Sequence, residues 1–443
     1  MLEFLCKYVT GTALPLLLIS TGIFFLFYLR FCIFKRRKKQ KRSGTGSVSP
    51  MSALSVALAG TLGVGNITGV AGALLLGGLG SVFWMWVCAL AAMVLKFAEI
   101  LLGIRHRRRN GTEFYGGAQY YMEDFFSQNG HPILARFVPV LFSLLCVLTA
   151  LTMGSMLQTN AAGFAFSEIS GVSALPVAAV ITVGAGVVIL LGKRDISPLT
   201  RVIIPLMTLL YTVMCLAVIW LGRGRLGSVF SEIFEGAFSL KSGGAGVAGF
   251  TFAQAVRYGA VRGLISNEAG CGTAPMAHCT ADAQSPFDQG LLGAVEVFID
   301  TVLLCTLTAL TVGIVFPAQS LAEFGGSEAE LVNSAFCAVL GKGAGVALSA
   351  ALFFFAFATV ICWGFYGSES LGYITKNKAI HSTFKACYLI CTFIGGLNVG
   401  RFVWQISDLA LGTMAIINLW VLFLMRKEIK AEADPKSKTK RFS

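Results

Sequence analysis

Apolar residues gather along this chain into runs of about 20, the length at which a helix crosses the hydrocarbon core of a bilayer. The second run, 52–76, is interrupted at its midpoint by Gly63-Val64-Gly65-Asn66. A membrane offers no water to backbone groups, so such an interruption is tolerated mainly where unwound backbone lines a polar cavity. Broken helices of this kind build substrate and ion sites in membrane transporters. Close helix packing is the alternative, because Gly65 and Gly69 have the small-residue spacing of helix contacts.

The whole pattern predicts eleven membrane helices, and the charges between them predict an orientation. The expected spans are 12–34, 52–76, 80–104, 133–160, 174–191, 199–221, 227–262, 288–316, 344–368, 382–397 and 401–426. Loops rich in Lys and Arg face the cytoplasm, and here the positive clusters occupy alternate loops. The clusters are Lys35 to Arg42, Arg105 to Arg109, Arg136, Lys193 with Arg194, Lys376 to Lys385, and the chain after Arg426. We therefore expect a multi-pass protein of the cell (inner) membrane with its N-terminus outside and its C-terminus in the cytoplasm.

Without the first helix, ten spans remain, and they divide into two sets of five that enter the membrane from opposite sides. This is the arrangement of an inverted repeat, in which both first helices should be broken. The span 227–262 contains Ser242-Gly243-Gly244-Ala245-Gly246, which is the expected second break; a rival lies at 266–272. We expect that rival near the cytoplasm, because Arg257 and Arg262 before it would be costly at the bilayer centre. The expected units are 1–50 (an extra helix with a basic linker), 51–222 and 223–428 (two five-helix repeats), and 429–443 (a basic tail).

Composition supports a membrane protein and excludes a soluble domain. Hydrophobic residues make up 56% of the 443 residues, charged residues only 13%, and the mean hydropathy is +0.75, whereas soluble proteins carry about 25% charged residues. The net charge of +13 is spread over short clusters without a basic aromatic face, which favours anionic membrane lipids over nucleic acid as partners. The twelve cysteines form no CxxC pair and lie mostly within apolar runs, so they are expected to pack as small hydrophobic residues.

A series of motifs resembles one family closely. The motifs are Leu29-Arg30-Phe31, Gly65-Asn66-Ile67, Gly69-Val70-Ala71, Gly77-Gly78, Phe83-Trp84-Met85-Trp86, Phe97-Ala98-Glu99, Gly116-Gly117 with Tyr120-Tyr121, Gln158 with Asn160, Arg262-Gly263, Ser266 to Pro275, Gln289-Gly290, Glu296 to Thr301, and Ala415-Ile416 with Asn418-Leu419. In this order they resemble the alanine or glycine:cation symporter family. That resemblance implies an all-α LeuT-type fold, a five-plus-five inverted repeat after one extra helix, and cation-coupled uptake of small neutral amino acids. Departures from the family pattern leave the choice of amino acid open; they lie at Thr68, Ile265, Cys271, Leu411 and Ile417.

The first break can provide complementary polar groups. An amino acid stripped of water needs donors for its carboxylate, and half-helix amino termini supply them. The exposed amides of Val64, Gly65 and Asn66 should therefore face the carboxylate. The carbonyl groups of Ala59 to Leu62 point the other way and suit a hard cation such as sodium.

Further site residues follow from the resemblance. It implies that Thr359 completes a sodium site with Ala59 and Leu62. It also places Gln158 and Trp363 at the substrate, with Phe238 closing over a small side chain. Gly243 in the expected second break would contribute backbone. Three of these residues have a structural alternative: a membrane Thr often bonds to its own helix, an amide such as that of Gln158 can join two helices, and a Trp is often an interface anchor.

Charged residues inside the spans form pairs with helical spacing. Lys96 and Glu99 are three residues apart and Glu296 and Asp300 four, which places each pair on one helix face. We expect the two acids to be neutralised by Arg257 and Arg262. Structural ion pairing, a cytoplasmic gate and a proton route all remain open for these groups.

The sequence therefore predicts a secondary active symporter in which inward sodium movement drives uptake of alanine or glycine by alternating access. It predicts no enzyme, no cofactor and no metal beyond sodium, because the histidines are far apart and no nucleophile motif accompanies them; these are His106, His131, His278 and His381. Proton coupling, a preference for glutamine or serine, and a transport-inactive amino acid receptor are the alternatives.

Overall fold

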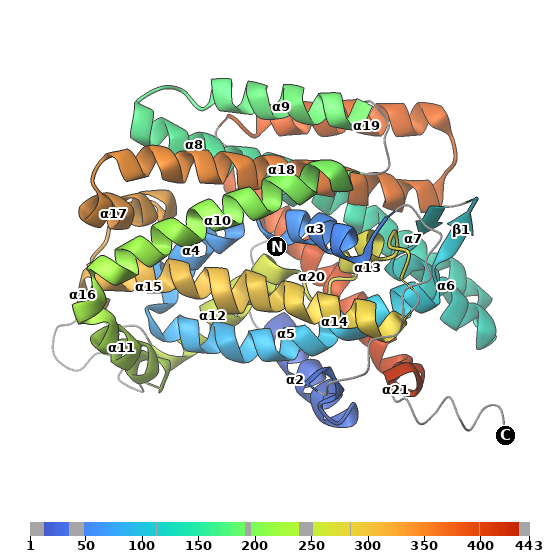
Figure 1. Cartoon of the computed structure of the whole chain (residues 1–443). Helices are drawn as coiled ribbons and strands as arrows, with labels where there is room; N and C mark the ends of the chain where they lie inside the picture. Colours follow the sequence, from blue (N-terminus) through green and yellow to red (C-terminus); the bar gives the residue numbers. More distant parts are fainter. Residues whose placement is uncertain are drawn as a thin grey trace.

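The computed structural model describes residues 13–34, 48–111, 113–190, 196–238, 251–283, 285–397 and 399–433, and helices make up nearly all of this part of the chain (Figure 1). Within these described ranges, six helices are long and apolar enough to cross a membrane, and a seventh span results if one bent pair counts as one. The six are α5 (Gly80–Arg105), α7 with η4 and α8 (Pro132–Leu151, Thr152–Leu157, Gln158–Ser170), α10 (Ser197–Leu221), α14 with η6 and α15 (Pro286–Val297, Phe298–Cys305, Thr306–Val315), α18 (Gly343–Ile374) and α20 (Arg401–Leu424).

Other expected spans coincide with shorter helices, so the count of eleven stays a prediction. These helices are α2 (Leu14–Tyr28), α9 (Leu175–Leu190) and α19 (Lys378–Ile394). The connecting elements are η2 (Cys32–Phe34), β1 (Arg108–Asn110), β2 (Glu113–Tyr115), α6 (Ala118–Gln128), η5 (Arg223–Arg225), α16 (Ala318–Ala322), α17 (Glu328–Leu340) and α21 (Arg426–Ala433). The strands β1 and β2 pair as an antiparallel hairpin.

The second expected span is broken as predicted. α3 (Pro50–Thr61) begins at Ser49, whose hydroxyl accepts a hydrogen bond from the amide of Ser52. α3 and the segment Val64–Gly77 meet at an angle of 65°. This segment comprises the short turn η3 (Val64–Asn66) and α4 (Thr68–Gly77).

The expected broken span 227–262 corresponds to two helices, α11 (Leu226–Phe238) and α12 (Phe252–Asn267), which lie before and after the expected break in the sequence. Thr251 caps α12, because its hydroxyl accepts from the amide of Gln254. α12 then continues past Arg262 to Asn267, five residues beyond the expected end. The expected break at 242–246 lies outside the described residues.

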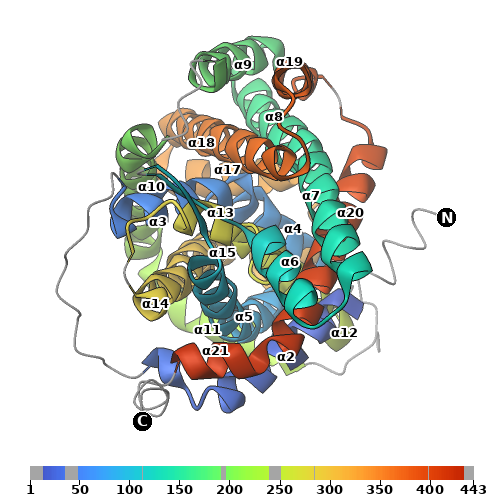
Figure 2. The ribbon, with the colours of Figure 1, turned by 90° about the vertical axis from the view of Figure 1, so that its right-hand side faces the viewer.

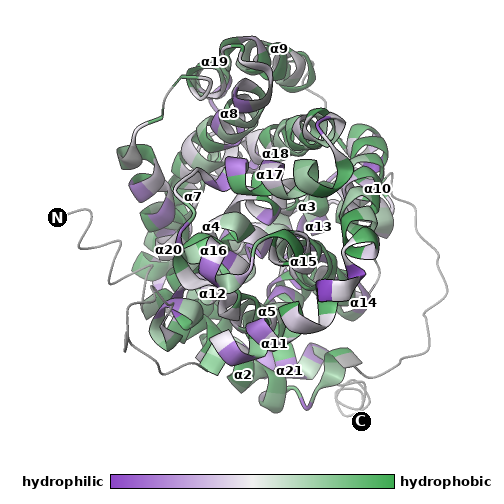
Figure 3. Cartoon of the chain, turned by 90° about the vertical axis from the view of Figure 1, so that its left-hand side faces the viewer, coloured by the Kyte–Doolittle hydropathy of each residue, from purple (hydrophilic) through white to green (hydrophobic). Residues whose placement is uncertain are grey.

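α5 occupies the interior of the bundle, and α9 and α19 lie side by side at one edge, away from α2 (Figure 2). Small residues allow the close contacts of α5: a Cβ on Gly80 would lie 2.2 Å from the backbone of Gly236, and a Cβ on Gly290 would lie 2.9 Å from Phe97. Hydrophobic residues dominate the outer helices, including α9, α10 and α19 (Figure 3). This distribution is the one that lipid requires of a membrane protein.

A polar cluster joins the end of α5 to α6 and α21. The ring of His106 contacts Asp124 (2.8 Å) and Glu428 (3.0 Å), and Arg108 pairs with Asp124 at 2.5 Å. Burial lowers the pKa of His106, but the hydrogen bonds and charges of Glu428 and Asp124 outweigh it, and the pKa lies above its ordinary value of 6.5. These groups form the His106 cluster, which fastens the C-terminal helix to the bundle.

Candidate functional site

The backbone at the first break has left the helical hydrogen-bond ladder. The amide of Gly63 donates to the carbonyl of Thr61 (2.9 Å) and to Oδ1 of Asn66 (3.2 Å). The amide of Val64 donates to Oε1 of Gln158 (3.4 Å). Polar side chains therefore satisfy groups that a continuous helix would satisfy itself.

Two of the side chains expected at the site meet at Gly63. A Cβ on Gly63 would lie 3.0 Å from both Oε1 of Gln158 and Oγ1 of Thr359. The Thr359 hydroxyl has two acceptors in reach, the carbonyl of Phe355 in its own helix (3.0 Å) and that of Leu62 (3.4 Å). α8 and α18 thus bring Gln158 and Thr359 to the end of α3, where Ala59 is fully buried one turn before the break.

A second break lies between α12 and α13 (Ala274–His278). Its backbone reverses through left-handed positions, with φ of 52° at Glu268 and 79° at both Gly270 and Gly272. Glycine adopts this conformation without strain, but Glu268 does so at a cost. This departure from ordinary backbone geometry is typical of functional sites.

The two breaks contact each other directly. The side-chain Nδ2 of Asn66 donates to the hydroxyl of Ser266 (3.0 Å) and to Oδ1 of Asp300 (2.7 Å), and the Ser266 hydroxyl donates to Oδ2 of Asp300 (2.9 Å). The expected position of 266–272 at the cytoplasmic end is therefore wrong, because this stretch lies beside the middle of the broken span. Arg262 does not force it outward, since its guanidinium reaches Glu328 at the start of α17 (3.4 Å).

Trp363 is fixed by a carboxylate that is not among the expected site residues. Its indole Nε1 donates to Oε1 of Glu268 (3.1 Å), while the other oxygen accepts from the Thr273 hydroxyl (2.9 Å). A Cβ on Gly154 would lie 2.3 Å from the Cβ of Trp363, so only glycine allows this approach. Glu268 stands in the Ser266 to Pro275 motif, and a buried acid within a loop motif is the signal that could have identified it.

Two π-helical stretches place residues at this site. η4 (Thr152–Leu157) directly precedes Gln158, and η6 (Phe298–Cys305) contains Asp300. π-helical turns widen a helix locally and occur often at functional sites. Both lie in spans that contact the breaks.

The buried charges have partners other than those expected. Glu296 pairs with Lys96 (3.1 Å) and with the ring of His278 (3.2 Å), so the prediction that Arg257 and Arg262 neutralise the acids is wrong. Lys96 also donates to the carbonyl of Asn267 (2.8 Å), at the end of α12. The second break is thereby attached to α5 and α14.

Glu99 holds the far end of the second break. Its Oε2 accepts from the amide of Gly272 (3.0 Å) and from the side chain of Asn418 (3.0 Å). Lys96 and Glu99 thus contact different parts of one loop, instead of forming an isolated pair on α5.

One expected substrate residue, Phe238, is not brought to the breaks. Phe238 ends α11 with 54% of its side chain exposed, and its ring packs on Phe83 (5.0 Å between centroids) and Trp84 (6.1 Å). Gly243 lies outside the described residues.

The site offers hard oxygen ligands and uncharged hydrogen-bonding groups. The oxygens of Leu62 and Thr359 lie together on one side, and those of Ser266, Asp300 and Thr301 on the other. Such oxygens are the ligands of hard cations. Among the described residues, no group of three or more His, Cys, Asp or Glu side chains could hold a metal ion. This chemistry suits reversible binding of an alkali cation and a polar solute.

The chain is similar to known transporters over nearly its whole length. The chain is 33% identical to the sodium/alanine symporter AgcS of Methanococcus maripaludis over 440 residues, which cover 96% of this chain and 94% of AgcS. It is 30% identical to the probable sodium/glutamine symporter GlnT of Bacillus subtilis, over 94% of this chain and 86% of GlnT. Both relatives are transporters rather than enzymes.

The fold has a counterpart among solved structures. The crystal structure of MhsT in complex with L-phenylalanine superposes with a TM-score of 0.55 at 14% identity, covering 89% of this chain and 93% of MhsT. The chain thus has the LeuT-type fold of that transporter. The model of the sodium:alanine symporter family matches residues 1–441. The chain therefore belongs to the sodium:alanine symporter family, a family of membrane transporters.

Proposed function

We propose that this chain is a secondary active symporter that couples inward sodium movement to uptake of a small neutral amino acid, alanine or glycine, by alternating access. The observation that carries the proposal is the direct contact between the two breaks, from Asn66 to Ser266 and Asp300. Ligands bound between two interrupted helices contact elements that can move relative to each other. The names of the relatives AgcS and GlnT support sodium and an amino acid as the transported pair.

The substrate would bind at the first break. The amides of Val64, Gly65 and Asn66 would donate to its carboxylate, in exchange for bonds such as that from Val64 to Gln158. Gln158 and Trp363 would form the walls, and the Glu268 carboxylate beside Trp363 could attract the ammonium group. Two further substrate residues, Phe238 and Gly243, stay predictions from the family resemblance.

Sodium would bind where α3 ends. The carbonyl oxygens of Ala59 and Leu62 and the hydroxyl of Thr359 form the proposed set, supported by the 3.4 Å contact between Leu62 and Thr359. An ion there would tie α18 to the first break and so order the amides that receive the substrate. Each ligand would then raise the affinity of the other by the same factor.

The architecture we propose keeps two five-helix repeats, 51–222 and 223–428, after the extra helix in 1–50, with eleven spans in total. A break near the start of each half, at Gly63 and at Glu268, supports it. We also propose an outside N-terminus and a cytoplasmic tail 429–443, as the positive loops indicate.

Uptake into proteoliposomes tests the proposal. Labelled L-alanine should accumulate only with an inward sodium gradient, and unlabelled glycine should compete. A proton gradient that drives uptake without sodium, or competition by glutamine or serine alone, would contradict the stated ion or substrate. Binding without counterflow would indicate a receptor.

Thr359 allows a sharper test of the ion site. Thr359→Val keeps the shape but removes the hydroxyl. A polar contact to a charged group contributes about 1.5 to 3 kcal/mol, so we expect the sodium concentration for half-maximal uptake to rise about 10- to 150-fold. Thr359→Ser should behave like the native protein. The matched control is Thr392→Val, because Thr392 is equally buried and bonds only its own helix, at the carbonyl of Tyr388 (2.8 Å). Equal sodium dependence of the two valine variants would refute the assignment.

A further inference from the structure

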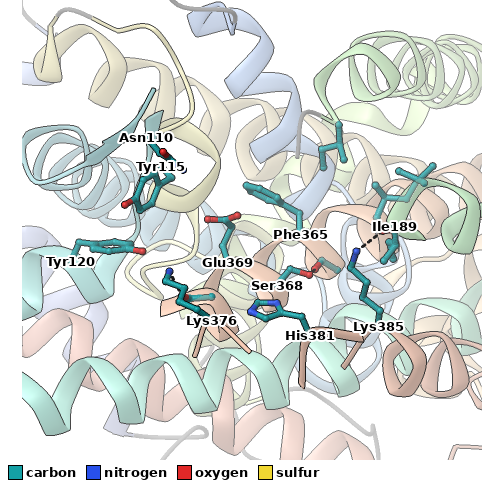
Figure 4. A pocket seen from close by; sticks show the side chains of 15 residues that line it. Asn110, Tyr115, Tyr120, Ile189, Phe365, Ser368, Glu369, Lys376, His381 and Lys385 are labelled. Atoms are coloured by element: carbon teal, nitrogen blue, oxygen red, sulfur yellow. Dashed lines mark hydrogen bonds between the residues drawn. The ribbon is translucent and has the colours of Figure 1, made fainter. Parts of the chain in front are cut away.

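A cavity of about 500 Å³ opens on the side of α18 away from the breaks. Ligand sites in proteins have volumes of about 300–1,000 Å³, so it can hold a small molecule or a headgroup. The β-hairpin, α6, the end of α9, the second half of α18 and the start of α19 surround it (Figure 4). Among its polar lining residues are Tyr115, Tyr120, Ser368, Glu369, Lys376 and Lys385.

This cavity does not belong to the substrate site. Successive residues of a helix turn by about 100°, so Phe365 and Ser368 lie roughly opposite Trp363 and Thr359 on α18. Phe365 and Ser368 line the cavity, while Thr359 and Trp363 face the breaks. A molecule in the cavity would therefore contact α18 from behind.

The lining carries a surplus of positive charge. Its two lysines, Lys376 and Lys385, against the one acid, Glu369, give a formal charge of +1 with His381 neutral. Lys385 donates to the carbonyl of Ile189 at the end of α9 (3.0 Å), and Lys376 donates to that of Gly372 (2.5 Å). A lysine ammonium has three donors, so both retain donors for an anion.

An exposed apolar stripe on α9 ends beside residues that line the cavity. The exposed side chains of α9 repeat at helical spacing up to the last residue of that helix, and they are Val180, Val183, Val187 and Leu190. Exposed Ile380 lies at the start of α19, one residue before His381 of the lining. A molecule with acyl chains could therefore lie along α9 and α19 while its polar end enters the cavity.

We propose that this cavity binds the headgroup of an anionic glycerophospholipid, with phosphatidylglycerol as the matching chemistry. The phosphodiester of this lipid carries one negative charge, which balances the +1 lining, and lysines are established phosphate ligands. Its glycerol hydroxyl groups can donate to the Glu369 carboxylate and accept from the hydroxyl of Tyr120. A zwitterionic lipid would leave the lining charge unbalanced.

Native mass spectrometry of the detergent-solubilised full chain tests this site, with added phosphatidylglycerol or phosphatidylcholine as probes. The native protein should retain phosphatidylglycerol in preference, and Lys376→Gln/Lys385→Gln should bind it about 25-fold more weakly, because each lysine near an anionic lipid contributes about fivefold. Glutamine can still donate to the carbonyl of Ile189, so the end of α9 keeps its cap.

The matched control is Lys378→Gln/Lys427→Gln, which removes two charges from exposed positions outside the cavity. Native binding by this control, together with loss in the cavity variant, would support the site. Equal losses in both variants, equal retention of both lipids, or full displacement of the lipid by millimolar inorganic phosphate would each overturn the proposal. The last result would assign the cavity to a soluble phosphate instead.

Discussion

Replacing Lys96 with methionine removes the cation that balances Glu296 but keeps a side chain of similar length. Both side chains are almost fully buried, with 0% and 1% exposed, and the charged atoms are 3.1 Å apart. At an effective dielectric constant of about 20, this separation corresponds to about 5 kcal/mol of attraction. His278 and Thr61 keep their hydrogen bonds to Glu296. We therefore expect the free energy of unfolding to fall by about 3 kcal/mol, which is at the lower end of the usual cost of breaking a buried ion pair.

The double variant Lys96→Met/Glu296→Gln should regain most of that stability, because neither charge is then left unpaired. Arg225→Met is the matched control: Arg225 and Glu232 are 3.0 Å apart, but 35% and 24% exposed, so the loss should be at most about 1 kcal/mol. The measurement is the free energy of unfolding in mixed micelles, followed by tryptophan fluorescence. Equal losses for Lys96→Met and Arg225→Met, or a double variant as unstable as the single one, would refute the reasoning.

Other substitutions test the site and its surroundings. Gly154→Ala would push a methyl group against Trp363, so it should reduce alanine uptake and lower the free energy of unfolding by about 1–3 kcal/mol. Gly227→Ala is the control and should do neither, because a Cβ there meets nothing within 4 Å. Similar uptake by both variants would contradict this prediction. Glu268→Ala should raise the KM for alanine far more than Glu268→Gln, because only glutamine retains an acceptor for the indole N–H, and identical KM values would disprove the role. The stability that His106 contributes should be complete below its ordinary pKa of 6.5 and lost as the pH rises through its higher folded-state pKa. The thermal unfolding temperature measured between pH 5 and 9 should therefore depend less on pH in His106→Gln than in the native protein. The same pH profile in both proteins would be contrary evidence.

The first break could be predicted from the sequence, because two glycines and an asparagine interrupt an otherwise apolar run at its centre. The break at 266–272 could not be singled out by the same rule. By composition the Gly-rich stretch 242–246 resembles a break more than 266–272 does, and the arginines before the latter argue against a position in the membrane interior. A long guanidinium side chain can reach a distant partner, as Arg262 does at Glu328. The desolvation of the charge is then compensated where the guanidinium lies, and the depth of the Cα does not decide it.

The partners of the buried acids depended on helix geometry that the sequence does not display. Glu296 and Asp300 would share a face if one α-helical period ran through both. The π-helical stretch η6 begins at Phe298, between them, and changes the direction of the residues that follow. Glu296 therefore faces Lys96, and Asp300 faces the first break at Asn66.

Such a widened turn gives up regular backbone bonding and persists only where side-chain contacts compensate. The bonds from Asn66, Ser266 and Thr301 to the Asp300 carboxylate are that compensation here. Asn66 and Ser266 are remote from Asp300 in the sequence, so only the assembled bundle brings them to it. The helices and the first interruption are thus encoded locally, whereas the chemistry at the breaks arises from side chains that meet only once the bundle has packed.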